Sequence, residues 1–245
     1  MSATKTEILI ATIARLLEGC RSVVIGNQSP VPGTAALVAR ELSGGAMRVT
    51  ILGSRRHSDF TNGGVETFDR AAQGRVDAFF LGGGQIDGEA NINLVGSGEY
   101  PRVDVRWPGS FGSAYLYFLV PRVILFREEH TPRVFVPKVS FVSAAGTSAP
   151  EVYRPGGPHA LVTNRCQFSF DRGRRRFRLE SVHPGHDADE VARETGFEFD
   201  RPAAVPETEA PPADWLKLLR GRIAGELAET YPKFAASVFG AAAAA

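Results

Sequence analysis

Glycine and amide residues are concentrated between Phe79 and Gly112, directly after a short apolar segment. That segment, Val76 to Leu81, has the composition of a fully buried strand and runs straight into three consecutive glycines. A strand that ends in glycines leaves backbone N–H groups that no Cβ atom separates from a ligand. A second glycine loop follows within the same stretch. We therefore predict a binding site built mainly from main-chain donors, formed by Gly82, Gly83, Gly84, Gln85, Asn91, Gly109 and Gly112.

Polar side chains beside the glycines favour a ligand site over a purely structural turn. The glycines alone are equally well explained by tight turns and close packing without a ligand. Several polar groups that converge at the end of a strand more often mark a binding site. The polar residues of this stretch are Gln85, Asp87, Glu89, Asn91 and Asn93.

A second polar stretch, residues 53 to 64, follows another apolar segment and contains Ser54, His57 and Asp59. Ligand sites of open α/β sheets lie at the carboxyl ends of the strands, which is where this stretch begins. His57 could act as a general base whose imidazole is oriented by Asp59. The alternative is an exposed polar turn. The histidines and cysteines lack metal-ligand spacing, so we expect no metal site.

The spacing of apolar residues along the chain predicts the helices and strands that position these residues. Apolar residues at helical spacing predict helices at 4–18, 34–42 and 65–73, with Thr34 as the cap of the second. Runs of β-branched and apolar residues predict strands at 21–26, 47–52 and 75–81. This succession is typical of parallel strands joined by crossover helices. We predict an α/β fold with a mainly parallel open sheet and helices on both faces.

Shorter patterns fill the second half of the chain. They predict strands at 123–126, 134–136 and 139–142, a small β-rich segment near Ala160–Val182 and a helix at 187–194. Residues 1–200 are predicted to form the α/β domain, residues 201–212 a linker rich in proline and acid, and residues 213–240 a C-terminal helix. The apolar stripe of that helix could close the core of its own domain or dock on a partner.

The composition excludes several classes of protein. Hydrophobic residues make up 43% of the 245 residues and charged residues 22%, which is ordinary for a globular protein. A formal net charge of +1 gives no reason to expect a nucleic-acid or membrane partner. No apolar run approaches the ~20 residues of a membrane span. Two distant cysteines and the lack of a secretory signal pattern favour the cytoplasm.

Four ordered motifs give the chain a specific resemblance. Gly-Gly-x-Gln-x-Asp-x-x-x-Asn-x-Asn begins at Gly82 and is followed by Pro-Gly-Ser-x-Gly, which begins at Pro108. The third motif is residues 133–143, and the fourth is a C-terminal signature formed by residues 183–185 and 195–199. Together they resemble the beta-type subunit of class I coenzyme A transferases. That group includes glutaconate CoA-transferase and the cholesterol ring-degrading hydrolase. The likeness covers roughly residues 8 to 199.

The resemblance implies a heteromeric acyl-CoA enzyme that pairs with an alpha-type subunit, as a heterodimer or an α2β2 assembly. It implies acyl-CoA and carboxylic acids as substrates and no tightly bound cofactor. In transferases of this family a glutamate attacks the acyl-CoA carbonyl, and CoA then passes through a glutamyl thioester to the acceptor acid. The glycine loops would stabilise the oxyanion or hold the CoA chain.

One departure from the family pattern bears on the reaction. The family glutamate follows the second strand, where this chain has Gly-Ser-Arg-Arg-His from Gly53 and no carboxylate before Asp59. We therefore name Ser54, His57 and Glu89 as candidate catalytic residues, with Glu89 inside the strongest motif. The alternatives are a hydrolase that opens a cyclic β-keto-acyl-CoA with an acid from the alpha-type subunit, and a non-catalytic scaffold subunit.

Overall fold

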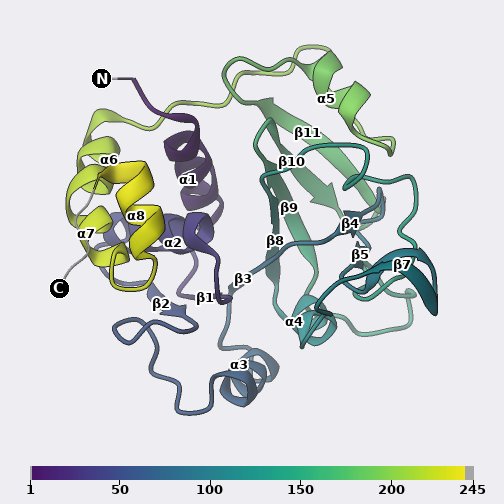
Figure 1. Cartoon of the computed structure of the whole chain (residues 1–245), viewed down its shortest axis with the longest axis horizontal. Helices are drawn as coiled ribbons and strands as arrows, with labels where there is room; N and C mark the ends of the chain where they lie inside the picture. The colour runs from purple at the N-terminus through teal and green to yellow at the C-terminus, as the bar shows by residue number, and fades with distance from the viewer. Residues whose placement is uncertain (1, 241–245) are drawn as a thin grey trace.

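Seven strands form the main sheet of the computed structural model, which describes residues 2–240 (Figure 1). The strand order is β11-β10-β9-β8-β3-β1-β2. The five strands from β9 to β2 are parallel, while β10 and β11 continue the sheet as an antiparallel hairpin. The strands are β1 Ser22–Ile25, β2 Arg48–Ile51, β3 Ala78–Leu81, β8 Arg122–Arg127, β9 Pro158–Thr163, β10 Cys166–Asp171 and β11 Arg176–Val182.

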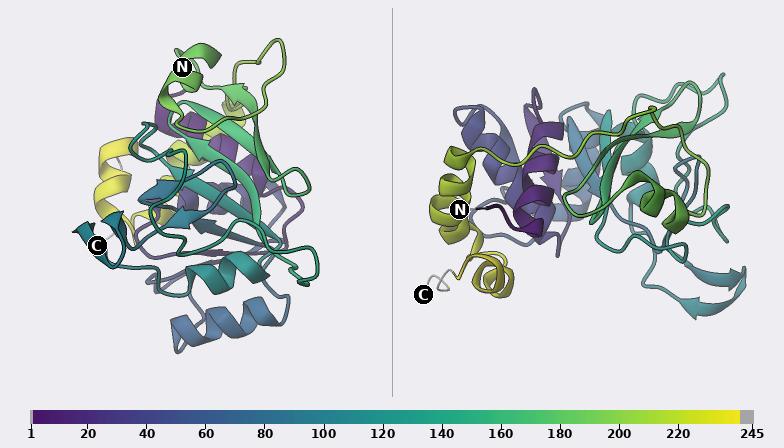
Figure 2. Two further views of the ribbon diagram at one scale, coloured as in Figure 1. Left: turned by 90° about the vertical axis from the view of Figure 1, so that its right-hand side faces the viewer. Right: turned by 90° about the horizontal axis from the view of Figure 1, so that it is seen from above.

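One face of the sheet is covered by helices from both ends of the chain (Figure 2). Helix α1 begins after Thr4, whose side chain forms a capping box with Glu7 and so satisfies two helix N-terminal donors. The apolar stripe of the C-terminal segment packs into the same core as α1 and α2. The stripe therefore closes the core of its own domain. These elements are α1 Lys5–Leu16, α2 Pro30–Leu42, α6 Ala213–Leu218, the π-helical turn η1 Leu219–Ile223, α7 Ala224–Leu227 and α8 Pro232–Phe239.

The other face carries shorter helices, two small sheets and long loops, packed around a second core. Tyr117 on α4 is fully buried there, and its hydroxyl donates to the carbonyl of Ala90 at 2.9 Å. The elements are α3 Gly63–Ala72, β4 Gln85–Ile86, β5 Ile92–Asn93, β6 Gly96–Glu99, β7 Arg102–Arg106, α4 Ser113–Leu119 and α5 Ala188–Glu194. None of the helices described in residues 2–240 is long and apolar enough to cross a membrane.

The fold class predicted from the sequence is confirmed, and several element boundaries are wrong. Helix α2 begins at Pro30 rather than Thr34, because a proline fits the first helical turn, where its missing N–H is no loss. The stretches 134–136 and 139–142 are not strands, and residue 135 makes only an isolated bridge to Ile86. The C-terminal segment is not one helix, since a π-helical turn interrupts it and Pro232 starts a new one.

Two histidines are buried without a charged partner and hold loops onto the sheet. Nδ1 and Nε2 of His130 lie 2.8 Å and 2.9 Å from the hydroxyls of Thr163 and Thr195. His183 lies 2.8 Å from the hydroxyl of Thr208 and 3.0 Å from the carbonyl of Thr163. Burial lowers the pKa of His130 to about 3 and that of His183 to about 4. Both side chains are therefore neutral in the folded chain near neutral pH.

These buried histidines predict a loss of stability in mild acid. Between the unfolded pKa of 6.5 and the folded value of about 3, the unfolded chain binds a proton at His130 that the folded chain does not. The free energy of unfolding must then fall as the pH falls through this window. We expect His130→Gln to reduce that slope by up to about 1.4 kcal/mol per pH unit. Urea denaturation between pH 7 and pH 4.5 measures the slope, and an unchanged slope would contradict the assignment.

Candidate active site

A cavity of about 560 Å³ opens at the carboxyl ends of the central parallel strands. Gly26 after β1, the glycines after β3 and Arg127 at the end of β8 form one wall. The second glycine loop, residues 107–111, and the start of α4 form the other wall. Because parallel strands end at the same edge, loops far apart in the sequence meet there. The structure thus brings the two predicted glycine loops together around one space.

The first glycine loop combines tight packing with free donors. A Cβ atom at Gly84 would lie 2.2 Å from the ring of Trp107, and one at Gly83 would lie 2.8 Å from the carbonyl of Gln85. The N–H of Gly84 donates to the carbonyl of Asn93 at 2.9 Å. Within residues 2–240, by contrast, the N–H groups of Gly82 and Gly83 have no hydrogen-bond partner. Close packing thus accounts for Gly83 and Gly84, and the N–H groups of Gly82 and Gly83 are left without a partner within the described chain.

The two glycines of the second loop also have different roles: one lines the cavity and the other allows close packing. Gly109 lines the cavity with a φ of +105°, a backbone conformation that side chains rarely adopt. Gly112 does not line it, since it precedes α4 and a Cβ atom there would lie 2.0 Å from the ring of Phe68. The lack of a side chain at Gly112 lets α3 and α4 approach each other.

Four polar side chains of the motif bond to neighbouring residues of the chain and do not line the cavity: Gln85, Asp87, Asn91 and Asn93. Asp87 is buried and accepts hydrogen bonds from the backbone N–H groups of Glu89 and Asn91. Asn91 accepts from the N–H of Gly146 at 3.0 Å. Nδ2 of Asn93 donates to Oε1 of Gln85 at 2.8 Å. Gln85 and Asn91, predicted as binding residues, therefore have hydrogen-bond acceptors that are already occupied within the chain.

Glu89 lies apart from both the glycine loops and Ser54. It lines a separate pocket of about 680 Å³ together with Lys138 and the arginines of the β10–β11 turn. Two of those arginines, Arg174 and Arg176, pair with Asp200. The carboxylate of Glu89 therefore faces a basic surface and not the cavity.

Ser54 and His57 are held by the C-terminal segment. The hydroxyl of Ser54 donates to Oε2 of Glu229 at 2.7 Å and accepts from the N–H of His57 at 2.9 Å. The N–H of Arg55 donates to the other carboxylate oxygen of Glu229 at 2.9 Å. Burial raises the pKa of Glu229, whereas the hydrogen bonds from Thr230, Ser54 and Arg55 lower it. The hydrogen bonds outweigh burial, so the pKa of Glu229 is lowered. The carboxylate of Glu229 in the C-terminal segment thus holds the loop after β2 in place through these hydrogen bonds.

The partner of His57 is not the one that the sequence predicts. Nε2 of His57 lies 3.1 Å from Oε1 of Glu226, in a contact without hydrogen-bond geometry. Asp59 instead pairs with Arg70 at 2.8 Å, so the prediction that Asp59 orients the imidazole is wrong. Burial lowers the pKa of His57 more strongly than Glu226 raises it. The imidazole is neutral and lines neither the cavity nor the pocket that adjoins it.

Sequence reasoning missed two sets of residues. Arg127 and Arg133 line the cavity, and Arg127 could have been found because it ends a strand of the same sheet. Glu226 and Glu229 had no such signal: Glu229 lies 175 positions from Ser54, and only the folded C-terminal segment joins them.

The fold is that of an α/β protein with a cavity between two glycine loops at the carboxyl edge of a parallel sheet. The chain belongs to the coenzyme A transferase family, since the family model for coenzyme A transferase matches residues 2–194. The resemblance found in the motifs is thereby confirmed. The carboxylates Glu226 and Glu229 lie outside the matched residues.

Individual relatives differ in the reaction that their names record. The beta-type subunit of 3-oxoadipate CoA-transferase from Pseudomonas knackmussii is 30% identical over 218 residues, 86% of this chain and 80% of that subunit. The IpdB subunit of the cholesterol ring-cleaving hydrolase from Rhodococcus jostii is 33% identical over 159 residues, 63% of this chain and 62% of that subunit. Sequence similarity thus extends to the corresponding subunits of a transferase and of a hydrolase.

Solved structures share the whole fold. The crystal structure of Rhodococcus jostii IpdAB has a TM-score of 0.79 at 26% identity and covers 90% of this chain and 94% of that one. The decarboxylase AibA/AibB has a TM-score of 0.77 at 25% identity and covers 97% and 99%. A transferase, a hydrolase and a decarboxylase are thus all similar to this chain, so the reaction must be argued from its own residues.

The contact between Gly84 and Trp107 predicts a spectroscopic change. We expect Gly84→Ala to displace the indole ring, because the added methyl group would overlap it at 2.2 Å. In a Trp215→Phe background Trp107 is the single tryptophan, so its emission maximum should shift to longer wavelength. Gly221→Ala is the control, since a Cβ atom there has open space, and it should leave the spectrum unchanged. An unshifted spectrum for Gly84→Ala would show that the two loops are not packed together.

The hydrogen bonds of Ser54 predict that the loop after β2 and the C-terminal segment open together. Ser54→Ala removes the donor to Glu229 and the acceptor for His57, and should cost about 1–3 kcal/mol of stability. Hydrogen exchange should speed up in residues 53–59 and in residues 224–231 alike. Ser58→Ala, in the same loop but without such bonds, is the matched control. Faster exchange in the loop alone would contradict the coupling.

Proposed function

We propose that this chain is the beta-type subunit of a two-subunit enzyme that acts on acyl-CoA thioesters, joined to an alpha-type subunit as a heterodimer or an α2β2 assembly. The observation that supports this most is the pair of glycine loops around one cavity, with unpaired N–H groups at Gly82 and Gly83. Attack on a thioester places negative charge on the carbonyl oxygen, and fixed N–H donors stabilise that charge. The loss of one such donor typically costs ~10²–10³ in rate.

The leading reaction is the transfer of CoA between carboxylic acids. An enzyme carboxylate attacks the thioester carbonyl and displaces the CoA thiolate, which then attacks the resulting anhydride to give an enzyme-bound thioester and the free acid. The acceptor carboxylate repeats these steps in reverse and leaves with CoA. Within residues 2–240 no carboxylate lines the cavity, and Glu129 lines the pocket that adjoins it at Gly82 and Arg127. Glu129 is the carboxylate of this chain best placed for the attack.

A second candidate is hydrolysis of a CoA ester without a covalent enzyme intermediate, including the opening of a cyclic β-keto-acyl-CoA. It is favoured by the absence of a carboxylate from the cavity lining within residues 2–240, and by the lack of a carboxylate between Gly53 and Asp59 in the loop after β2. In this reaction an acid of the alpha-type subunit would activate water at the thioester or the ring carbonyl. The glycine N–H groups would keep the same role.

The reaction of the co-expressed pair of subunits tests the proposal. An acyl-CoA panel is assayed with and without acetate or succinate, and free CoA and new thioesters are followed. New thioester that forms only with an acceptor supports transfer, whereas free CoA or an opened ring without acceptor supports hydrolysis. An intact complex that leaves the whole panel unchanged contradicts both and favours a scaffold subunit.

Substitutions of Glu129 and of Glu89 should change the kcat measured in that assay to different extents. If Glu129 forms the covalent intermediate, Glu129→Gln should lower kcat by a factor of at least about 10³, because an amide cannot make the anhydride. Glu89→Gln should change kcat less than about twofold, since Glu89 faces a different pocket. Trapping with hydroxylamine followed by peptide mapping identifies the modified carboxylate. A hydroxamate on Glu89 would contradict the placement of the site.

A further inference from the structure

The glycine-loop cavity carries a charge that its role as an oxyanion site does not explain. Its walls are mostly apolar, with Leu81, Leu94 and Trp107 among them. The charged side chains that line it, within residues 2–240, are Arg127 and Arg133, and both are positive. An apolar space with two guanidinium groups and no acid in its wall favours a ligand that carries an anionic group.

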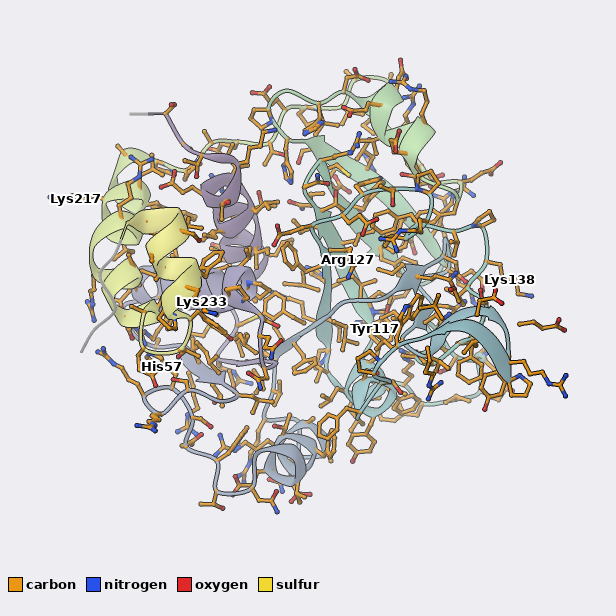
Figure 3. The ribbon with its side chains drawn as sticks, viewed as in Figure 1. His57, Tyr117, Arg127, Lys138, Lys217 and Lys233 are labelled. Atoms are coloured by element: carbon orange, nitrogen blue, oxygen red, sulfur yellow. The ribbon has the colours of Figure 1, made fainter. Side chains whose placement is uncertain are left out.

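Arg127 has donors left without a partner. This residue, labelled in Figure 3, is the last of β8. Its Nη2 donates to Oε2 of Glu129 at 3.3 Å. Its Nε is buried and has no hydrogen-bond partner. A buried donor that remains unsatisfied is unfavourable by about 1–3 kcal/mol, and more when the group is charged. An acceptor supplied by a ligand would remove that penalty.

Glu129 cannot neutralise both arginines. Nη2 of Arg133 lies 2.7 Å from each of its carboxylate oxygens, and the hydroxyl of Thr131 donates to it at 3.0 Å. These contacts, that of Arg133 first, lower the pKa of Glu129, so its single charge is already shared. The other nearby acid, Glu128, is exposed and lines the adjoining pocket instead. An excess of positive charge therefore faces the cavity at Arg127.

We propose that Arg127, supported by Arg133, is a substrate-binding residue that holds an oxyanion group of the acyl-CoA. This group is either a second carboxylate on the acyl chain or a phosphate of CoA, because a guanidinium binds both through the same pair of N–H donors. The inference rests on the proposed function, since it concerns the same cavity. It adds that the thioester lies at Gly82 and Gly83 while an anionic group lies at Arg127.

The test compares Arg127→Gln with a matched control in the co-expressed complex. Arg75→Gln makes the same change at an exposed position before β3, at the opposite edge of the sheet. Substrates are succinyl-CoA, butyryl-CoA and the corresponding phosphate-free pantetheine thioesters. Affinity is also measured directly by quenching of tryptophan emission, and gel filtration confirms that each complex is intact. A charge-assisted hydrogen bond of about 1.5–3 kcal/mol predicts a ten- to hundredfold rise in KM or Kd for Arg127→Gln.

The pattern of loss identifies the anionic group. If Arg127→Gln raises KM or Kd only for the two succinyl compounds, with or without phosphate, Arg127 binds the acyl carboxylate. If KM or Kd rises for both CoA thioesters and for neither pantetheine thioester, Arg127 binds a phosphate of CoA. If Arg127→Gln behaves like Arg75→Gln with every compound, the inference is wrong.

Failure of the proposed function can be told apart from failure of this inference. If the unmodified complex turns over none of the thioesters but binds them with an affinity that depends on Arg127, the proposed function fails and the binding role stands. If it turns over all four with no effect at Arg127, the function stands and the inference fails. A complex that neither binds nor converts any of them overturns both.

Discussion

The packing of the Trp107 ring on the backbone of Gly84 is the contact on which the site depends. A side chain of any size at position 84 would occupy the space of the ring. The contact sets the distance between the two loops and hence the width of the cavity between them. Behind it, the hydrogen bonds of Asp87, Asn91 and Asn93 hold the residues that follow the first glycine loop to one another and to Gly146. Buried polar groups that are fully paired in this way keep a backbone rigid.

A rigid backbone matters because the available donors are main-chain N–H groups. Such donors stabilise developing charge only when they are already in place, with no reorganisation during the reaction. The amide side chains therefore support the site without entering it. This division explains how a motif rich in asparagine and glutamine can serve a cavity whose walls are mostly apolar.

The sheet was predictable from the sequence, and the contacts made by the last helices were not. Strands β1, β2 and β3 are each followed within two residues by a glycine, so their shared edge follows from local patterns. The glycine loops follow in the same way, although Gln85 and Asn91 could not be told from ligand contacts by residue type. The contact of Glu226 with His57 and the hydrogen bond of Ser54 to Glu229 join segments about 170 positions apart. No local pattern encodes such a pair, since it arises only from how the C-terminal stripe packs on α1 and α2.

The central claim is that a CoA thioester binds between the two glycine loops, and a crystal structure of the two-subunit complex with an unreactive acyl-CoA analogue tests it most directly. The account predicts the carbonyl oxygen of the analogue within hydrogen-bond distance of the N–H groups of Gly82 and Gly83, with Trp107 beside the acyl group. An analogue bound in the pocket of Glu89, or one that leaves these N–H groups without a contact, would contradict it.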